Sequence, residues 1–481
     1  MKKLVIFIIV ILLCVAGWAG ATYVVGGQVQ SQYTHMIDEF GRLGPITMSQ
    51  QSYQRGFLAS TALTVLELEL PDATRPGAQA GLDTQKETLQ IVFESAIKHG
   101  PLLAGAAPGL ALIETRLVSV TPSSETVERL LQEFPQLSEP LSVTRIDFSG
   151  TMTDRVRIPA LETSIGQAQI EWGGLSVDSS YAPGDKTIVG TFDMPRLEIR
   201  DADGELTWQG LHGTLDLVEA LPLLYVGSTD VSFGNMKMAF ASDKDGAQQA
   251  MQLKGLKLSS RSDCREKLVN VKQTMEFGGV LVDGETYGPG RCVIDAKNLD
   301  GELLGSFQAQ VRELYRSGQV SNPDELIGQL LPLYTQLLTG LLEKSPELNI
   351  SSFSFATPQG NIDGRLLIRY DSGQGVDTRN PQAMLQALDA SADLVVHENL
   401  VKLLMKQNLK NVLTAAKLNG QIPESFSDAD LAELAARQTD AQLETVLAQA
   451  LVVRDGDMIR SSATFRQGKL EVNGQPLSLF Q

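Results

Sequence analysis

Histidine and cysteine are scarce in this sequence of 481 residues, which contains four histidines and three cysteines. Ligands so few and so widely separated exclude a zinc or iron–sulfur centre built from several of them. Basic residues are in the minority, since 40 lysines and arginines face 57 acidic residues and leave a net charge of −17. An acidic chain lacks the cationic surface that nucleic acid requires, so we expect no nucleic-acid partner. We also expect no metal and no cofactor, because the histidines and cysteines are few and scattered.

Catalytic signatures are missing as well. The sequence has no Gly-x-Ser-x-Gly, no His-Glu-x-x-His, no phosphate-binding glycine loop and no Gly-x-Gly-x-x-Gly motif. The four histidines lie in separate segments, at His35, His99, His212 and His397. We therefore name no catalytic residue. A hydrolase with an unrecognised site stays open as the alternative to a protein without enzymatic activity.

One long hydrophobic run stands at the N-terminus, from Leu4 to Val25. About 20 apolar residues suffice for a helix to span a bilayer. Lysines precede the run and no basic cluster follows it closely, so we expect the N-terminus in the cytoplasm and the bulk of the chain outside. We interpret residues 1–27 as a cytoplasmic tip and uncleaved signal anchor. Cleavage after Ala21, which ends a small-x-small sequence, is the alternative.

The segment behind the anchor, residues 28–50, has apolar residues at helical spacing and is expected to continue outward as a stalk. Everything beyond the anchor would then lie in an oxidising compartment. Cys264 and Cys292 are the two cysteines of that part, and the even count favours a disulfide between them. Two unrelated thiols are the alternative.

Strand patterns dominate residues 51–300, where apolar and polar residues alternate and Asp-Gly or Asn-Gly pairs mark tight hairpins. Residues 301–481 mix strands with helices, which we expect at 301–317, from Asn322 onward, at 399–418 and after Ser427. The predicted fold class is α+β: a mostly antiparallel, extended or grooved sheet, a C-terminal helical cluster and one N-terminal transmembrane helix. The leucine-rich helix after Asn322 is expected to pack in a core.

A basic stripe stands out in this acidic chain. Lys402, Lys406 and Lys410 recur at every fourth residue of a predicted helix and therefore share one face. Such a face can rest on anionic lipid headgroups. An ordinary solvated helix face explains the same spacing, and both interpretations stay open.

Several short motifs together resemble the YdgA-like family of Gram-negative envelope proteins, whose function is unknown. The motifs are spread over the whole chain and comprise Tyr53-Gln54-Arg55-Gly56, Lys98-His99-Gly100-Pro101, Asn322-Pro323, Leu331-Pro332, Ser345-Pro346-Glu347-Leu348, Thr357-Pro358-Gln359-Gly360 and Val472-Asn473-Gly474-Gln475-Pro476-Leu477. The resemblance implies a β-rich periplasmic body anchored in the bacterial inner membrane and carries no catalytic residues.

The residues of the first two motifs have a structural interpretation. Arg55 beside Tyr53 suits a buried or half-buried guanidinium that locks the first strand to a neighbour. Gly56 and Gly100 suit turns, and Pro101 suits the end of the strand after His99. Alternatively, Arg55 and His99 together bind an anionic headgroup.

The function that we expect is non-enzymatic. An inner-membrane-anchored protein with an extended periplasmic sheet would bind a hydrophobic or lipidic ligand or another envelope protein. A periplasmic hydrolase and a purely structural protein–protein scaffold are the alternatives. The sequence leaves the oligomeric state open.

Overall fold

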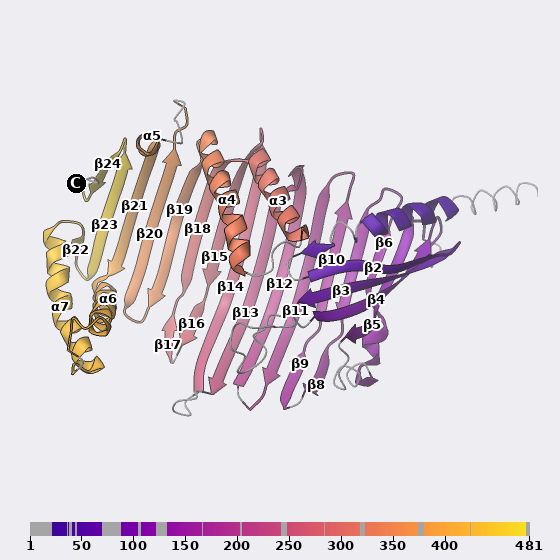
Figure 1. Ribbon diagram of the computed structural model, residues 1–481, viewed down its shortest axis with the longest axis horizontal. Coiled ribbons are helices and arrows are strands. Elements are labelled where there is room, and N and C mark those ends of the chain that lie inside the picture. Colours follow the sequence, from indigo (N-terminus) through magenta and orange to yellow (C-terminus); the bar gives the residue numbers. More distant parts are fainter. Residues whose placement is uncertain are drawn as a thin grey trace, which may run out of the picture. The chain divides into compact units, whose positions relative to one another are not determined.

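The structure is a computed structural model that describes residues 22–35, 37, 41–43, 46–69, 88–103, 107–121, 132–165, 167–202, 204–241, 248–282, 284–317, 323–373, 380–423 and 425–477. The chain divides into two compact units. The first comprises Met1–Tyr225 and Gly305–Leu333, and the second Val226–Leu304 and Tyr334–Gln481. Each unit is built on an open antiparallel sheet, and strands account for 57% of the structure. The predicted β-rich, antiparallel fold with a C-terminal helical cluster is thus confirmed (Figure 1).

The first unit contains the strands β1 (Arg42–Leu43), β2 (Ile46–Arg55), β3 (Ala59–Glu69), β4 (Thr88–His99), β5 (Ala111–Thr121), β6 (Pro140–Ile146), β7 (Met152–Ile158), β8 (Leu161–Ile165), β9 (Ala168–Trp172), β10 (Leu175–Ala182), β11 (Thr187–Arg200) and β12 (Gly204–Leu221), and the 3-10 turn η3 (Pro135–Ser138). Strands β1 to β7 pair in chain order. Strand β10 continues the sheet beside β7 and leads to β11 and β12. The hairpin β8–β9 pairs with β11.

A helix over residues 22–35, with residue 37 also helical, lies on this sheet (the indigo helix of Figure 1). Every fourth side chain, from Val25 through Val29 and Tyr33 to Ile37, is buried. These side chains pack against a cluster that contains Ala62, Ile97, Ala111, Ile113 and Ile146. The Tyr33 hydroxyl also bonds to Thr64 at 2.8 Å and to Ser95 at 3.2 Å. The beginning of the predicted stalk is therefore part of the folded unit.

The predicted membrane segment falls mostly outside the described residues. Of Leu4–Val25, the structure describes only residues 22–25, and there Val25 packs in the protein core. Among the described residues, no helix is both long enough and apolar enough to cross a membrane. The anchor therefore stays a prediction for residues 4–21, and its described end lies against the sheet.

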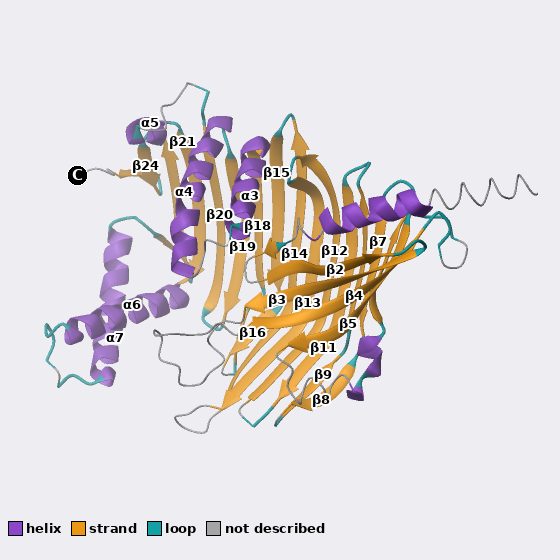
Figure 2. Cartoon of the chain, turned by 45° about the vertical axis from the view of Figure 1, so that its right-hand side comes forward, coloured by secondary structure: helices purple, strands orange, loops and turns teal. Residues whose placement is uncertain are grey.

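The second unit holds β13 (Leu224–Ala241), β14 (Gln248–Arg265), β15 (Leu268–Phe277), β16 (Gly279–Val282), β17 (Glu285–Tyr287), β18 (Gly290–Asp300), β19 (Glu347–Thr357), β20 (Gly360–Tyr370), β21 (Leu388–His397), β22 (Val453–Asp455), β23 (Met458–Arg466), β24 (Lys469–Val472) and β25 (Gln475–Leu477). The main sheet runs β13-β14-β15-β18-β19-β20-β21-β23-β24-β25. Figure 2 shows the strands in orange.

Four of the helices in residues 301–481 lie where the sequence predicts them. They are α3 (Gly301–Arg316), α4 (Pro323–Leu341) with the 3-10 turn η4 (Leu342–Lys344), α6 (Glu398–Leu418) and α7 (Asp428–Ala448). The short helix α5 (Pro381–Gln386) was not predicted. Ser427 caps α7 as expected, because its side chain accepts from the Asp430 backbone while Asp430 accepts from the Ser427 backbone.

The core packing predicted for α4 is found for only part of its apolar surface: Leu326, Leu330, Leu333 and Leu341 are half-buried and Leu337 is buried. Ile327, Leu331, Tyr334 and Leu338 are exposed. Helical spacing shows that one face is apolar, but it does not show whether another layer covers that face.

The predicted disulfide between Cys264 and Cys292 is wrong, because both cysteines are free. Strand β15 lies between the two strands that carry them. Cys264 is opposite Val269 of β15, whereas Cys292 is opposite Met275, six residues further along. Two strand spacings of about 4.8 Å and six rises of about 3.3 Å place the cysteines roughly 20 Å apart. A disulfide requires Cα atoms within about 7 Å.

Candidate functional site

The residues of the first two motifs gather at one corner of the first unit, where the helix over residues 22–35 meets the sheet. Arg55 ends β2 and His99 ends β4. The His99 ring is 5% exposed. Its Nδ1 lies 3.3 Å from the Phe57 carbonyl, which can only accept, so Nδ1–H is the donor. Nε2 is then the acceptor for the Ser60 hydroxyl at 2.9 Å.

A serine that donates to an oriented histidine is the arrangement of an activated nucleophile. Burial argues against that use here, since Ser60 is only 3% exposed. Desolvation by burial also lowers the pKa of His99, with a smaller contribution from the positive charge of Arg55. The pair is therefore a neutral hydrogen-bonded link inside the fold, and no substrate carbonyl can reach the Ser60 oxygen.

Arg55 lies at the surface of this corner. Its guanidinium donates to the carbonyl oxygen of Tyr23 and stands 4.5 Å from the centre of the Tyr23 ring. The prediction placed Arg55 buried or half-buried between strands, whereas the structure uses it to tie the helix to β2. Of the two residues predicted to bind a headgroup together, only Arg55 is exposed.

The remaining motif residues shape the backbone around this corner. Gly56 faces the Ala59 carbonyl, where an added Cβ would stand 2.3 Å from the oxygen. Gly100 has the Gly109 carbonyl in the place that a Cβ would occupy. The peptide bond between Gly100 and Pro101 is cis. Tyr53 packs beside the core, with its ring centre 6.0 Å from that of Tyr33. The predicted turn roles of the glycines agree with these contacts.

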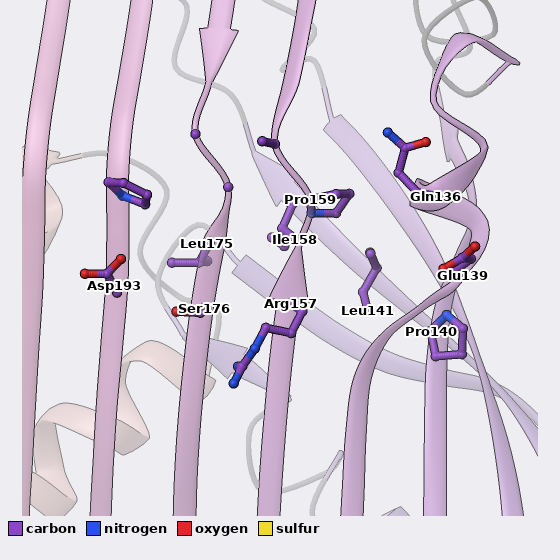
Figure 3. A pocket seen from close by; sticks show the side chains of 14 residues that line it. Gln136, Glu139, Pro140, Leu141, Arg157, Ile158, Pro159, Leu175, Ser176 and Asp193 are labelled. Atoms are coloured by element: carbon purple, nitrogen blue, oxygen red, sulfur yellow. The ribbon is translucent and has the colours of Figure 1, made fainter.

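A hollow of about 400 Å³ lies among β6, β7, β10 and β11 of the same unit (Figure 3). Arg157 stands in it, but both oxygens of the Asp178 carboxylate accept from this guanidinium at 2.8 and 2.7 Å. The acidic side chains of Glu139 and Asp193 lie at opposite sides of the hollow (Figure 3). No histidine or cysteine is among its 14 lining residues. Outside the lining, Nδ1 of His212 lies 3.6 Å from Oδ2 of Asp193.

The second unit presents a different feature, a row of apolar residues across its sheet. Residues that are directly opposite in paired strands point to the same face. The registers align Leu258 (β14), Met275 (β15), Cys292 (β18), Phe353 (β19), Gly364 (β20) and Leu394 (β21). We call these six residues the apolar row.

The large side chains of the apolar row are open to solvent. Leu258, Met275, Phe353 and Leu394 are between 40% and 45% exposed. At Gly364, a Cβ would lie 3.7 Å from Phe353 and 3.6 Å from Leu394, so these two side chains approach each other over the glycine. The row thus offers a nearly continuous apolar strip that crosses neighbouring strands.

The opposite face of the same sheet is charged. Its ion pairs join neighbouring strands and include Arg261–Asp230, Arg291–Glu276, Lys272–Asp295, Lys297–Glu347 and Arg369–Glu347. Lys297 and Arg369 together lower the pKa of the Glu347 carboxyl. The two faces therefore differ sharply in polarity, and only one of them suits an apolar ligand.

Sequence reasoning missed the apolar row. The alternation along each strand was visible, but a row across strands depends on the register of every pair.

The lysines of the basic stripe lie on α6 as predicted, but they are not equally available. Lys402 contacts Glu398 at 3.1 Å and Asp440 of α7 at 2.9 Å, and these hydrogen bonds raise its pKa. The charge of Lys402 therefore joins two helices. Lys406 is exposed and Lys410 is half-buried.

Among the described residues, no group of three or more His, Cys, Asp or Glu side chains is arranged to bind a metal ion.

Comparison with known proteins gives one match. A family model described as a bacterial protein of unknown function, DUF945, matches residues 1–480. No curated protein and no solved structure matches the chain.

Proposed function

The chain belongs to the DUF945 family of bacterial proteins, and from this premise we propose that it is a non-enzymatic envelope protein that binds the acyl chain of a lipid on the apolar row. The observation that carries the proposal is the exposure of four large apolar side chains on one face of neighbouring strands. Contiguous exposed apolar surface often marks a binding site.

The length of the apolar row fits one acyl chain. From β14 to β21 the row crosses five strand spacings of about 4.8 Å, or roughly 24 Å. One leaflet of a bilayer is about half of the ~30 Å hydrocarbon core, so an extended acyl chain is somewhat shorter than the row. The charged opposite face offers no comparable surface.

The location is proposed with the function. Residues 4–25 are uncharged and follow two lysines, which favours a bacterial inner-membrane anchor with the bulk of the chain in the periplasm. This anchor would keep the apolar row near a source of lipid. We also propose that the chain is a YdgA-like protein, which is compatible with the family match.

A pair of variants on adjacent residues tests the ligand. Phe353→Glu puts a charge on the apolar row, whereas Ser354→Glu puts the same charge on the opposite face, between Arg291 and Asp363. We expect lipid to co-purify with the full-length wild type and with Ser354→Glu in native mass spectrometry, and to be lost from Phe353→Glu. Equal lipid content in both variants would contradict binding at the row. A wild type without lipid would favour the scaffold alternative.

The free thiol of Cys292 provides a local probe of the same site. In a full-length chain with Cys14→Ser and Cys264→Ser, a polarity-sensitive fluorophore can be attached to Cys292 in the middle of the row. Addition of a long-chain fatty acid should shift its emission in a saturable manner. A fluorophore on Ser354→Cys in a Cys292→Ser background is the control and should not respond.

A further inference from the structure

Three connections at one end of the first sheet carry exposed large apolar side chains. In an antiparallel sheet every second connection lies at the same end, which here brings together the links β2–β3, β4–β5 and β6–β7. Phe57 and Leu58 lie in the first link, Leu102 in the second and Phe148 in the third. Such residues in hairpin tips do not contribute to the core, so their presence needs another explanation.

The described helix begins at the same end. Arg55, the last residue of β2, donates to the carbonyl oxygen of Tyr23 and so holds the start of the helix beside the β2–β3 link. Tyr23 and Val24 point outward there. Together with the tip residues they form what we call the apolar rim: Tyr23, Val24, Phe57, Leu58, Leu102 and Phe148, each between 48% and 61% exposed.

We propose that the apolar rim inserts into the interfacial layer of the membrane that the preceding residues enter. This inference rests on the anchoring proposed above. Residues 4–21 are uncharged and directly precede Thr22, so a span over them would deliver the chain to the bilayer surface near Tyr23. The rim residues surround that position, and aromatic side chains favour the membrane interface.

The charged residues near the apolar rim are compatible with a membrane interface, but they contribute little to the binding energy. Arg55 places a guanidinium at the level where lipid phosphates would lie. Asp147, next to Phe148, opposes it. The carboxylate of Asp147 accepts from Ser149 and Thr151 in its own turn, and these hydrogen bonds lower its pKa, so it stays charged. Arg145 is a second cation there, because its guanidinium donates to the Pro108 carbonyl of the β4–β5 link and its charge helps to lower the pKa of Asp147. With two cations and one anion the net charge is small, so insertion into a neutral phosphatidylcholine membrane would depend on the apolar side chains and little on salt.

Insertion would bring one end of the strands of the first unit into contact with the membrane, so that the unit is held there by the apolar rim as well as by the anchor. This is the end of strands β2 to β7 at which the links β2–β3, β4–β5 and β6–β7 lie. The opposite end of the same strands, where Ser138 of η3 precedes β6, would face away from the bilayer.

Depth-dependent fluorescence quenching tests the rim in the full-length chain. Every protein carries Cys264→Ser and Cys292→Ser and keeps a single cysteine for the fluorophore. In the first protein this is the native Cys14. In the other two, Cys14→Ser is combined with Phe148→Cys or with Ser138→Cys. The proteins are reconstituted in phosphatidylcholine vesicles that contain a lipid with a nitroxide near its headgroup. We expect quenching at 148 to be several-fold stronger than at 138 and unchanged by added salt. Phe57→Ser with Leu58→Ser should reduce the quenching at 148.

The outcomes separate the rim from the anchor. A second vesicle preparation contains a lipid with its nitroxide deep in the acyl chain. If this lipid quenches the Cys14 label while the labels at 148 and 138 are quenched equally, the insertion of the apolar rim is disproved and the anchor is supported. A Cys14 label that no lipid nitroxide reaches overturns the anchor, and strong quenching at 148 in that case still supports the rim as a peripheral membrane contact. No quenching at any position overturns both.

Discussion

Gly26 and His99 lie in direct contact: a Cβ added to Gly26 would stand 2.7 Å from Nδ1 of His99. The absence of a side chain at Gly26 is what allows the helix to lie over the buried imidazole. The contact joins a residue from the end of the predicted anchor segment, residues 1–27, to the His99-Gly100-Pro101 motif at the end of β4. Together with the Arg55–Tyr23 interaction, it fixes the start of the helix on the sheet.

We expect Gly26→Ala to destabilise the first unit. Replacing glycine by alanine within a helix normally stabilises it by about 0.5–1 kcal/mol. At Gly26 the methyl meets a ring whose two nitrogens are both hydrogen-bonded, and overpacking of this kind costs about 1–3 kcal/mol. Gly27→Ala is the matched control, because its Cβ meets only the mobile end of Arg55 at 3.4 Å. Thermal unfolding of the full-length variants should separate them, and equal midpoints would contradict the contact.

Acid should loosen the same corner. Burial lowers the pKa of His99 below its usual 6.5, so the unfolded chain binds a proton that the folded chain resists. The stabilising effect of the neutral ring is complete above about pH 6.5 and declines as the pH falls from there toward the lowered pKa. The protection factors of the amides of residues 22–35, which correct for the slower intrinsic exchange at lower pH, should therefore fall over this range. If His99→Gln shows the same pH response as the wild type, another group causes the response. Glu347 and Glu398 do not interfere in this range, because their pKa values are lowered and they take up protons only below about pH 4.5.

Cys264 and Cys292 should both react as thiols. Because β15 separates Cys264 from Cys292, alkylation of the unfolded, unreduced protein should modify both, and peptide mapping should recover no linked pair. Reductant should leave the thermal unfolding midpoint unchanged. A linked peptide would show that the strand register differs from the one described.

Adjacent leucines of α4 should respond very differently to truncation. Leu337 is 9% exposed, whereas Leu338 is 64% exposed. Leu337→Ala should cost about 2–5 kcal/mol of folding free energy, as for other buried leucines, and Leu338→Ala less than about 0.5 kcal/mol. Denaturant unfolding of the two variants measures the difference. Similar losses would mean that the apolar stripe is covered.

The orientation of the chain can be tested at its C-terminus. A reporter that is active only in the periplasm, fused after Gln481, should be active, and the mature protein should keep its original N-terminus in the membrane fraction. A chain that is released from membranes and begins at Thr22 would show instead that the N-terminal segment is a cleaved signal.

The sequence by itself determined the local structure of this protein. Alternating side chains and Asp-Gly or Asn-Gly pairs define antiparallel strands through geometry within a few residues, and Ser427 with Asp430 defines the start of α7 in the same way. The motifs Tyr53-x-Arg55-Gly56 and His99-Gly100-Pro101 were visible for the same reason, as short unusual strings.

Only the tertiary structure decided which of these local features meet. The apolar row depends on five strand registers, and a shift of one residue in any of them would break it. The same registers separate Cys264 from Cys292. Gly26 and His99 are 73 positions apart by residue number. Ile327, Leu331 and Leu338 of α4 are exposed because no layer covers them among the described residues. Contacts between distant residues and the presence of a covering layer depend on the packing of whole elements, which periodicity within one element does not encode.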